Sequence, residues 1–500
     1  MSIKKLAGQT LWYGVPKIVS RFLNYGLTLV GFQLFKASET SNLTLVYAVI
    51  PFLNVIFTYG LETSFFRFAQ LTDRNKLYNT LTISIVTTTV FFTLILLFLQ
   101  DPMAQLLDMQ DNPEYVTWMV GILFFDTLAV LPLAKLRLEE RPRKYALVNV
   151  STILLNILLV LFFLFIAKSK YNQNPDSIWG IIYQPEVGVG YFIISNLIAS
   201  AVSLLFLYKE FSVFRWIFDK KLWTDVMLYS YPLVIVGFGG MINEMLSRVV
   251  YRKVLHLDAL TEKRELGIFG ANYKLAVLIT IFIQIFRLAA EPFFFNQSTK
   301  EDAPRTYARV MKFFVIACCF MFLVVSLFLD FWKLLIASRF KEYGEGIHIV
   351  PILAMGSVFL GIYYNLSVWY KLTNKNMYAA YLTIGGAILT ILLNMWWIPH
   401  FRYTGAAWAT FCCYAFMMVT SYVQGQMYYP VPYAWKKLVA YLVIVSLLYL
   451  IQLGIISFTP GWTILHLVIG MALLGGFALF VLKIEKKEFE RLPYVGKYLR

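Results

Sequence analysis

The chain has 500 residues, of which 59% are hydrophobic and 14% are charged. A water-soluble protein of this length cannot bury so much apolar surface, so the composition excludes a soluble enzyme. The net charge of +16 would favour nucleic-acid binding in a soluble protein, but its distribution along this chain is typical of a membrane protein.

Hydrophobic stretches follow one another along the whole chain. A stretch of roughly 20 apolar residues is long enough to cross a bilayer as a helix. We predict about fourteen such spans, near 10–34, 43–66, 78–99, 115–134, 145–167, 187–208, 224–248, 267–291, 311–330, 347–369, 377–398, 404–427, 436–456 and 461–482. No small-residue cleavage site follows a short apolar core, so the first span is expected to be retained. The expected fold class is an all-α polytopic membrane protein.

Basic residues gather in the loops on one side of the predicted membrane. The loops 135–144 and 209–221 are rich in Lys and Arg, whereas the loop 100–114 has neither and carries four acidic residues. Because positively charged loops stay in the cytoplasm, we place the two basic loops there, together with the N-terminus and the basic tail 483–500. We therefore expect a multi-pass protein of a bacterial cytoplasmic (inner) membrane with both termini in the cytoplasm.

Three short patterns of the first half return in the second half in the same order. Aromatics precede a proline at Trp12–Pro16 and at Tyr229–Pro232, Glu-x-x-Phe-Phe begins at Glu62 and at Glu291, and Tyr-Ala follows the fourth and the tenth span. Chance is a rival explanation for each match alone, and the shared order is the better evidence. Six spans per copy predict a parallel pseudo-twofold repeat with a cavity between the halves. The expected domains are an N-lobe (1–208), a C-lobe (209–428) and a C-terminal part with two further helices and the basic tail (429–500).

Ionisable side chains inside the predicted spans are the sharpest functional signal. Each costs at least ~2.5 kcal/mol in hydrocarbon and therefore needs a partner or a wet cavity. They concentrate in the first two spans of each repeat: Lys17, Arg21, Glu62, Arg67, Glu244, Arg248, Lys274, Arg287 and Glu291. Asp126 is a lone acid in the fourth span.

The spacing of these charges separates two kinds of pair. Lys17 and Arg21 are four residues apart on one helix face, where like charges repel unless an anion joins them. An anionic ligand explains this pair, and arginine suits phosphate because its planar fork donates two hydrogen bonds at once. Snorkelling to the interface is the structural alternative. The opposite charges of Glu244–Arg248 and Arg287–Glu291 fit neutralised structural pairs equally well.

Two sets of site residues follow from this reading. We predict that Lys17, Arg21, Arg248, Lys274 and Arg287 bind substrate. Glu62, Glu244, Glu291 and Asp126 are predicted to orient the cations or to couple transport to an ion; for Asp126 the alternative is a hydrogen-bonded structural acid, and for Glu62 it is snorkelling. The four Cys form two adjacent pairs and the four His are scattered, so no metal site and no cofactor are expected.

The pattern as a whole resembles the multidrug/oligosaccharidyl-lipid/polysaccharide (MOP) exporter superfamily, and most of all its polysaccharide-biosynthesis, or oligosaccharide flippase, branch. The opening Ala7-Gly-Gln-Thr-Leu-Trp-Tyr-Gly14 is similar to the first helix of many such flippases. Ser20-Arg21 resembles the Ser-Arg pair of the related lipid II flippases, in which the arginine helps to bind pyrophosphate. Those relatives carry a further arginine two turns later, where this chain has Leu27. The departure favours a polyprenyl-pyrophosphate glycan other than lipid II.

The resemblance implies two six-helix lobes arranged in a V that open alternately to each side of the membrane. It implies a transporter, not an enzyme, which moves a polyprenyl-pyrophosphate-linked oligosaccharide and is driven by a proton or sodium gradient or by the membrane potential. The expected partners are this substrate, the lipid bilayer and polysaccharide assembly proteins, with no nucleic acid.

Two other functions remain open at this point. A multidrug/cation antiporter of the same superfamily would need acidic residues deep in its cavity, whereas this set is mostly basic. A membrane glycan polymerase or glycosyltransferase would need a catalytic pair in an outer loop, and the longest such loop, 168–186, holds only Asp176 and Glu186.

Overall fold

In a computed structural model the chain is helical, and no strand occurs among the residues that the structure describes. Those residues are 3–255, 257–297, 300–373, 375 and 377–490, without the side chains of 3–18, 252, 288–289, 291–292, 295–296, 487 and 489. The predicted all-α membrane fold class is confirmed. Inside a bilayer a helix satisfies every backbone hydrogen bond within its own segment, which is why apolar spans of this composition adopt it.

The chain divides into two compact units, each built from two stretches of sequence. Unit 1 comprises Met1–Gly270 and Met377–Ala409, and unit 2 comprises Ala271–Asn376 and Thr410–Arg500. This division differs from the lobes predicted from the repeat, because α12 (Lys220–Leu255) of the second half packs on α2 (Ala37–Thr58) and α3 (Leu61–Phe68) of the first. The lobe boundaries at 208 and 428 stay a prediction.

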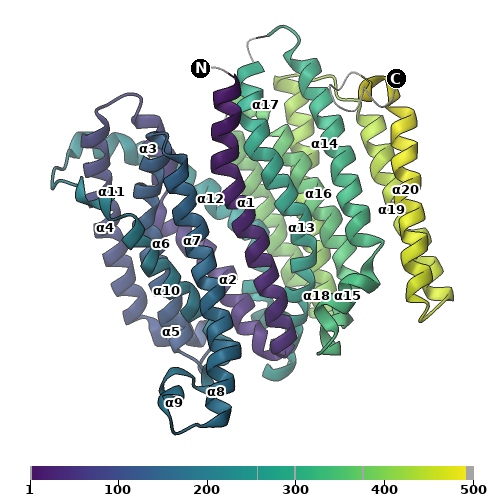
Figure 1. The fold of residues 1–500 in the computed structure, drawn as a ribbon. Coiled ribbons are helices and arrows are strands. Elements are labelled where there is room, and N and C mark those ends of the chain that lie inside the picture. The colour runs from purple at the N-terminus through teal and green to yellow at the C-terminus, as the bar shows by residue number, and fades with distance from the viewer. Residues whose placement is uncertain (1–2, 256, 298–299, 374, 376, 491–500) are drawn as a thin grey trace. The chain divides into compact units, whose positions relative to one another are not determined.

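Unit 1 is a helical bundle in which α4, α6, α10 and α7 lie side by side (Figure 1). Helix α1 packs chiefly on α7. The remaining elements of this unit are short or join the long helices. In chain order unit 1 contains α1 (Ile3–Leu34), α2, α3, α4 (Arg74–Phe98), α5 (Gln100–Leu106), α6 (Glu114–Leu138), α7 (Pro142–Leu161), the π-helix η1 (Phe162–Ala167), α8 (Lys168–Gln173), α9 (Ile178–Ile182), the 3-10 helix η2 (Pro185–Val187), α10 (Gly190–Phe206), α11 (Tyr208–Ser212), α12 and the first parts of α13 (Ala259–Gln297) and α18 (Met377–Tyr428).

Unit 2 is organised around α14, which packs on both α16 and α19, while α19 packs on α20. It contains the later parts of α13 and α18, α14 (Ala303–Ser326), α15 (Leu329–Ala337), the 3-10 helix η3 (Lys341–Ile349), α16 (Val350–Leu366), α17 (Val368–Leu372), α19 (Trp435–Phe458), α20 (Thr463–Ile484) and α21 (Lys486–Phe489).

Among the described residues, 11 helices are long and apolar enough to cross a membrane, or up to 12 if a pair bent by 118° counts as one span. This count does not confirm the predicted fourteen. Two of the predicted spans lie within α18, whose 52 residues far exceed the roughly 20 that a bilayer needs. The backbone of α18 leaves helical geometry at Arg402 (φ 53°, ψ −138°). The bent pair covers the predicted span 187–208.

The break at Arg402 is held by a buried carboxylate. A non-glycine residue with positive φ is uncommon and requires surrounding contacts to hold it. Arg402 Nη1 donates to Glu265 Oε1 at 2.7 Å, and Tyr251 Oη donates to the other oxygen at 2.8 Å. Because Glu265 is only 2% exposed, this ion pair fixes the bend at Arg402, a few residues before the chain leaves unit 1 at Ala409.

Candidate functional site

Two arginines from distant parts of the sequence converge on one glutamate in unit 1. Arg21 lies on α1, and Glu244 and Arg248 lie on α12. The carboxylate of Glu244 interacts electrostatically with both guanidinium groups. Arg248 is 7% exposed, and its Nη2 donates to the backbone oxygen of Glu244 at 3.0 Å. We call these three residues the arginine site.

The carboxylate in the arginine site is not enclosed by a completed ion-pair network. Among the described side chains, none forms a hydrogen bond or an ion pair within 4.0 Å with the carboxylate of Glu244. On α1, the hydroxyl groups of Ser20 and Tyr25 are buried and have no hydrogen-bond partner among the described residues. The two guanidinium groups that interact with Glu244 are suited to binding an anion with several oxygen atoms. The side chain of Lys17, predicted to join this group, lies outside the described residues.

The other two predicted substrate-binding cations belong to unit 2. The guanidinium of Arg287 stacks on the ring of Tyr364, 4.7 Å from its centroid. It lines a depression together with Lys371. Lys274, on the same helix as Arg287, is partly buried. Since these residues and the arginine site lie in different units, a common binding wall remains a prediction.

The acidic residues predicted to orient those cations have different surroundings. Glu62 pairs with Arg137 of α6, and both side chains are about half exposed. Arg137 also lies over the ring of Phe66, 4.8 Å from its centroid. The described contacts of Glu62 are therefore with a helix-end arginine and not with Arg21 or Arg248. The side chain of Glu291 lies outside the described residues.

Asp126 lies where three helices of unit 1 meet. Its side chain is exposed, although Ser200 of α10 and Tyr47 of α2 are its neighbours. Asn196 Nδ2 donates to Tyr47 Oη at 3.3 Å. A carboxylate near a serine, a tyrosine and an asparagine has the oxygen atoms to bind a proton or a small cation. Among the described residues, no three His, Cys, Asp or Glu side chains come together as a metal centre.

Residues 9–297 match the model of a family described as polysaccharide biosynthesis protein, which is more than half of the chain. The chain belongs to this family. A search of the curated proteins gives no match.

Solved structures show which fold this polysaccharide biosynthesis protein shares. It is similar to the lipid II flippase MurJ in an inward closed conformation, with a TM-score of 0.66, 14% identity, and coverage of 94% of this chain and 98% of that one. It is also similar to an inward-facing multidrug resistance MATE family transporter of the MOP superfamily (TM-score 0.63, 12% identity, 84% and 94% covered). A third similar structure is the MATE multidrug transporter DinF-BH (TM-score 0.64, 16% identity, 85% and 96% covered). The predicted polysaccharide-biosynthesis branch is confirmed, and the fold is shared with a transporter of the MOP superfamily.

Several residues of interest in this polysaccharide biosynthesis protein were not found from its sequence. Tyr47, Asn196 and Asn365 are neutral, so a search for charges inside spans passes over them. Lys371 follows Trp369-Tyr370 at a span end, where a basic residue is typical of any interface. A search for buried amides beside aromatic residues would have found Asn365 within Tyr363-Tyr-Asn-Leu366.

Proposed function

We propose that this protein is a flippase that moves a polyprenyl-pyrophosphate-linked oligosaccharide across the bacterial cytoplasmic membrane by alternating access. The observation that carries the proposal is the arginine site, in which Arg21 and Arg248 both interact electrostatically with Glu244 on helices predicted to cross the membrane. Membership of the polysaccharide biosynthesis family and a fold shared with a lipid II flippase support it.

The chemistry of the substrate fits these residues. A pyrophosphate carries several anionic oxygens, and two guanidinium forks can each donate two parallel hydrogen bonds to it. Arg21, with Lys17 one turn away, holds the pyrophosphate together with Arg248, and Lys274 and Arg287 of unit 2 are further substrate-binding cations. Glu244 keeps the two arginines of unit 1 oriented and limits their repulsion when no substrate is bound. Glu62 and Glu291 act in the same way on neighbouring cations.

Asp126 is the residue that we propose for ion coupling. Its exposed carboxylate among Tyr47, Asn196 and Ser200 exchanges a proton or a sodium ion. Because the charge of the group changes when it binds the ion, binding alters the electrostatic balance inside unit 1. The driving force is then a proton or sodium gradient, with the membrane potential acting on the same charge.

Replacement of Arg21 tests the proposal directly. Arg21→Ala removes two charge-assisted hydrogen bonds, each worth about 1.5 kcal/mol or more, so export of the surface glycan should fall roughly a hundredfold. Arg74→Ala is the matched control, because Arg74 is exposed at the start of α4. Glycan export is measured in cells with equal amounts of each protein. Undiminished export by Arg21→Ala would contradict the proposal.

A cation antiporter is the second candidate, and the exposed Asp126 favours it. An acid within a membrane-spanning helix can bind a cationic substrate as well as a coupling ion. Purified protein in vesicles decides between the two. Transport of a cationic dye that is lost in Asp126→Asn and kept in Arg21→Ala would favour the antiporter, and translocation of a lipid-linked glycan would favour the flippase.

A further inference from the structure

Several helices of unit 2 end around one depression. Helix α13 ends at Gln297, α16 and α17 end at Leu366 and Leu372, and α18 ends at Tyr428, while α14 and α19 begin close to the same place. Two adjoining shallow pockets lie among these ends, and both are open to the outside. Because membrane spans end at the level of the lipid headgroups, the depression lies where lipid phosphates are abundant.

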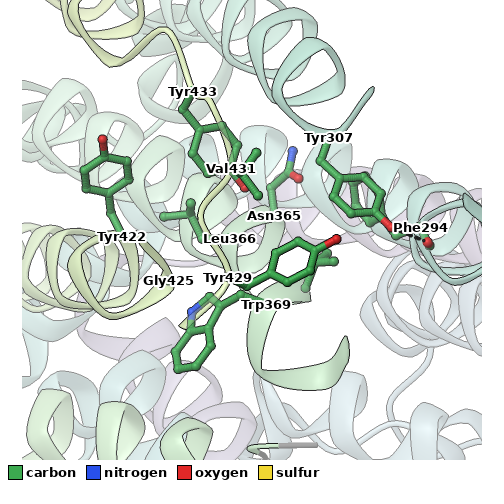
Figure 2. A pocket seen from close by; sticks show the side chains of 11 residues that line it. Phe294, Tyr307, Asn365, Leu366, Trp369, Tyr422, Gly425, Tyr429, Val431 and Tyr433 are labelled. Atoms are coloured by element: carbon green, nitrogen blue, oxygen red, sulfur yellow. Dashed lines mark hydrogen bonds between the residues drawn. The ribbon is translucent and has the colours of Figure 1, made fainter. Parts of the chain in front are cut away.

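Asn365 lies between the two pockets and has an unused donor. It is 6% exposed and lines both pockets. Its side-chain nitrogen is buried without a hydrogen-bond partner among the described residues. Figure 2 shows this side chain among the rings of Tyr307, Tyr429 and Tyr433. A buried amide donor without a partner is costly, and an acceptor oxygen from a ligand would satisfy it.

The charge around Asn365 selects the kind of acceptor. Arg287 and Lys371 line the second pocket, and Tyr364 orients the guanidinium of Arg287 by stacking. Among the described residues that line the two pockets, none is acidic. A guanidinium, an ammonium and an amide nitrogen together offer only donors, which matches a phosphate with its acceptor oxygens.

The first pocket argues for a lipid as the source of the phosphate. Its wall is mainly aromatic and includes Trp369, Tyr429 and Phe294. It adjoins the cationic pocket through Asn365, Phe294 and Val368, which line both. Apolar carbons attached to a phosphate bound by Arg287 and Lys371 would therefore meet an apolar surface, whereas free phosphate would not use it.

We infer that Arg287, Lys371 and Asn365 form a second binding site, in unit 2, for the phosphate of a lipid. The inference deepens the proposed function and rests on it, because Arg287 is also one of the proposed substrate-binding cations. The site would hold a phosphate-bearing lipid at the headgroup level, separately from the arginine site of unit 1. Lipid binding at this site can be measured in the absence of transport.

The test compares lipid binding by the purified full-length protein and its variants. Native mass spectrometry gives the affinity for short-chain phosphatidic acid, for the phosphatidylcholine of the same chains and for inorganic phosphate. Phosphatidic acid should bind most tightly. Lys371→Ala and Asn365→Leu should each weaken its binding about tenfold or more, and Arg305→Ala, which removes an exposed arginine at the start of α14, should not.

Asn365→Leu also separates a ligand role from a structural one. Leucine has a similar shape and removes the unsatisfied donor, so the thermal stability of the protein without lipid should stay equal or rise. Loss of phosphatidic acid binding at unchanged stability supports the site. Wild-type binding by both Lys371→Ala and Asn365→Leu overturns it, and equal affinity for inorganic phosphate overturns the assignment to a lipid. Arg21→Ala should still bind phosphatidic acid here, so the flippase and this site can fail independently.

Discussion

A glutamate in each of the two units interacts with two cations, and the two carboxylates differ in how close those cations lie. In unit 2, Glu485 is 2% exposed, and its oxygens pair with Lys312 at 2.8 Å and with Lys437 at 2.5 Å. Tyr441 Oη donates a third hydrogen bond at 2.6 Å. In unit 1, Glu244 interacts with Arg21 and Arg248 only at longer range. The carboxylate of Glu485 thus forms direct ion pairs, whereas Glu244 interacts with its two arginines at longer range. Unit 1 has a directly paired carboxylate of its own in Glu210, which is 1% exposed and lies 2.9 Å from Arg141 and 2.5 Å from Lys144.

The difference separates a structural ion cluster from a binding site. A buried carboxylate with all its acceptor positions used fixes the elements around it, here α14, α19 and the end of α20, and has nothing left for a ligand. The carboxylate of Glu244 interacts electrostatically with Arg21 and Arg248, and these are two of the cations that we propose to bind the substrate. Composition alone does not distinguish these cases; contact distances do.

The largest expected effect is that of Glu485→Ala. Removing the carboxylate takes the shortest ion pair from Lys312, which is 13% exposed and keeps, among the described residues, only Glu488 at 3.4 Å, and leaves this lysine near Lys437. This should cost about 3 kcal/mol of stability. Thermal unfolding of the purified protein measures it. Glycan export should fall only as far as the amount of folded protein falls. A stable Glu485→Ala protein would show that the completed network is not structural.

Glu244→Gln should have the reverse pattern. The two arginines lose the charge that orients them, so export should fall roughly tenfold, the equivalent of about 1.4 kcal/mol in substrate binding. Stability should change by less than about 1 kcal/mol, because no direct ion pair is broken. Export assays and thermal unfolding of the same preparation check both parts. A loss of stability equal to that of Glu485→Ala would show that Glu244 is as structural as Glu485, which would contradict its role in a binding site.

Acidification should affect the Glu485 network in a defined range. Burial raises the pKa of the Glu485 carboxyl, but hydrogen bonds from Lys312, Lys437 and Tyr441 outweigh it and hold the pKa below the ordinary value of 4.5. The network therefore contributes its full stability above pH 4.5 and loses it as the pH falls through the lower, folded-state pKa. Melting temperatures measured from pH 7 downward should drop less in Glu485→Gln than in the wild type. Equal slopes would contradict this assignment.

The smallest effect is expected at an exposed ion pair of unit 1. Lys263 Nζ lies 2.8 Å from Asp111, whose side chain is 76% exposed. Solvent screening limits such a pair to about 1 kcal/mol or less. A double-mutant cycle with Lys263→Ala and Asp111→Ala isolates its coupling energy in thermal unfolding. A coupling above about 2 kcal/mol would show that this contact is as structural as the Glu485 network.

Much of the architecture could be predicted because the bilayer acts on each segment separately. The predicted spans fall on helices, and the superfamily follows from the same pattern. The number of spans was predicted less well. Two predicted spans lie in the single helix α18, whose backbone departs from helical geometry only at Arg402. The Glu485 network was missed, because in the sequence Glu485 is one acid among Lys483, Lys486 and Lys487 and reads as part of a basic tail.

The sequence by itself determined the solvent, the helices and the presence of costly charges within them, because hydrophobicity and span length are local properties. Only the tertiary structure decided which of those charges meet. Arg21 reads as the partner of Lys17 and Arg248 as the partner of Glu244, since spacing along one helix is all that a sequence displays. The packing of separate helices brings Arg21 to Glu244 and pairs Glu62 with Arg137, because contacts between distant segments depend on how whole helix faces fit together.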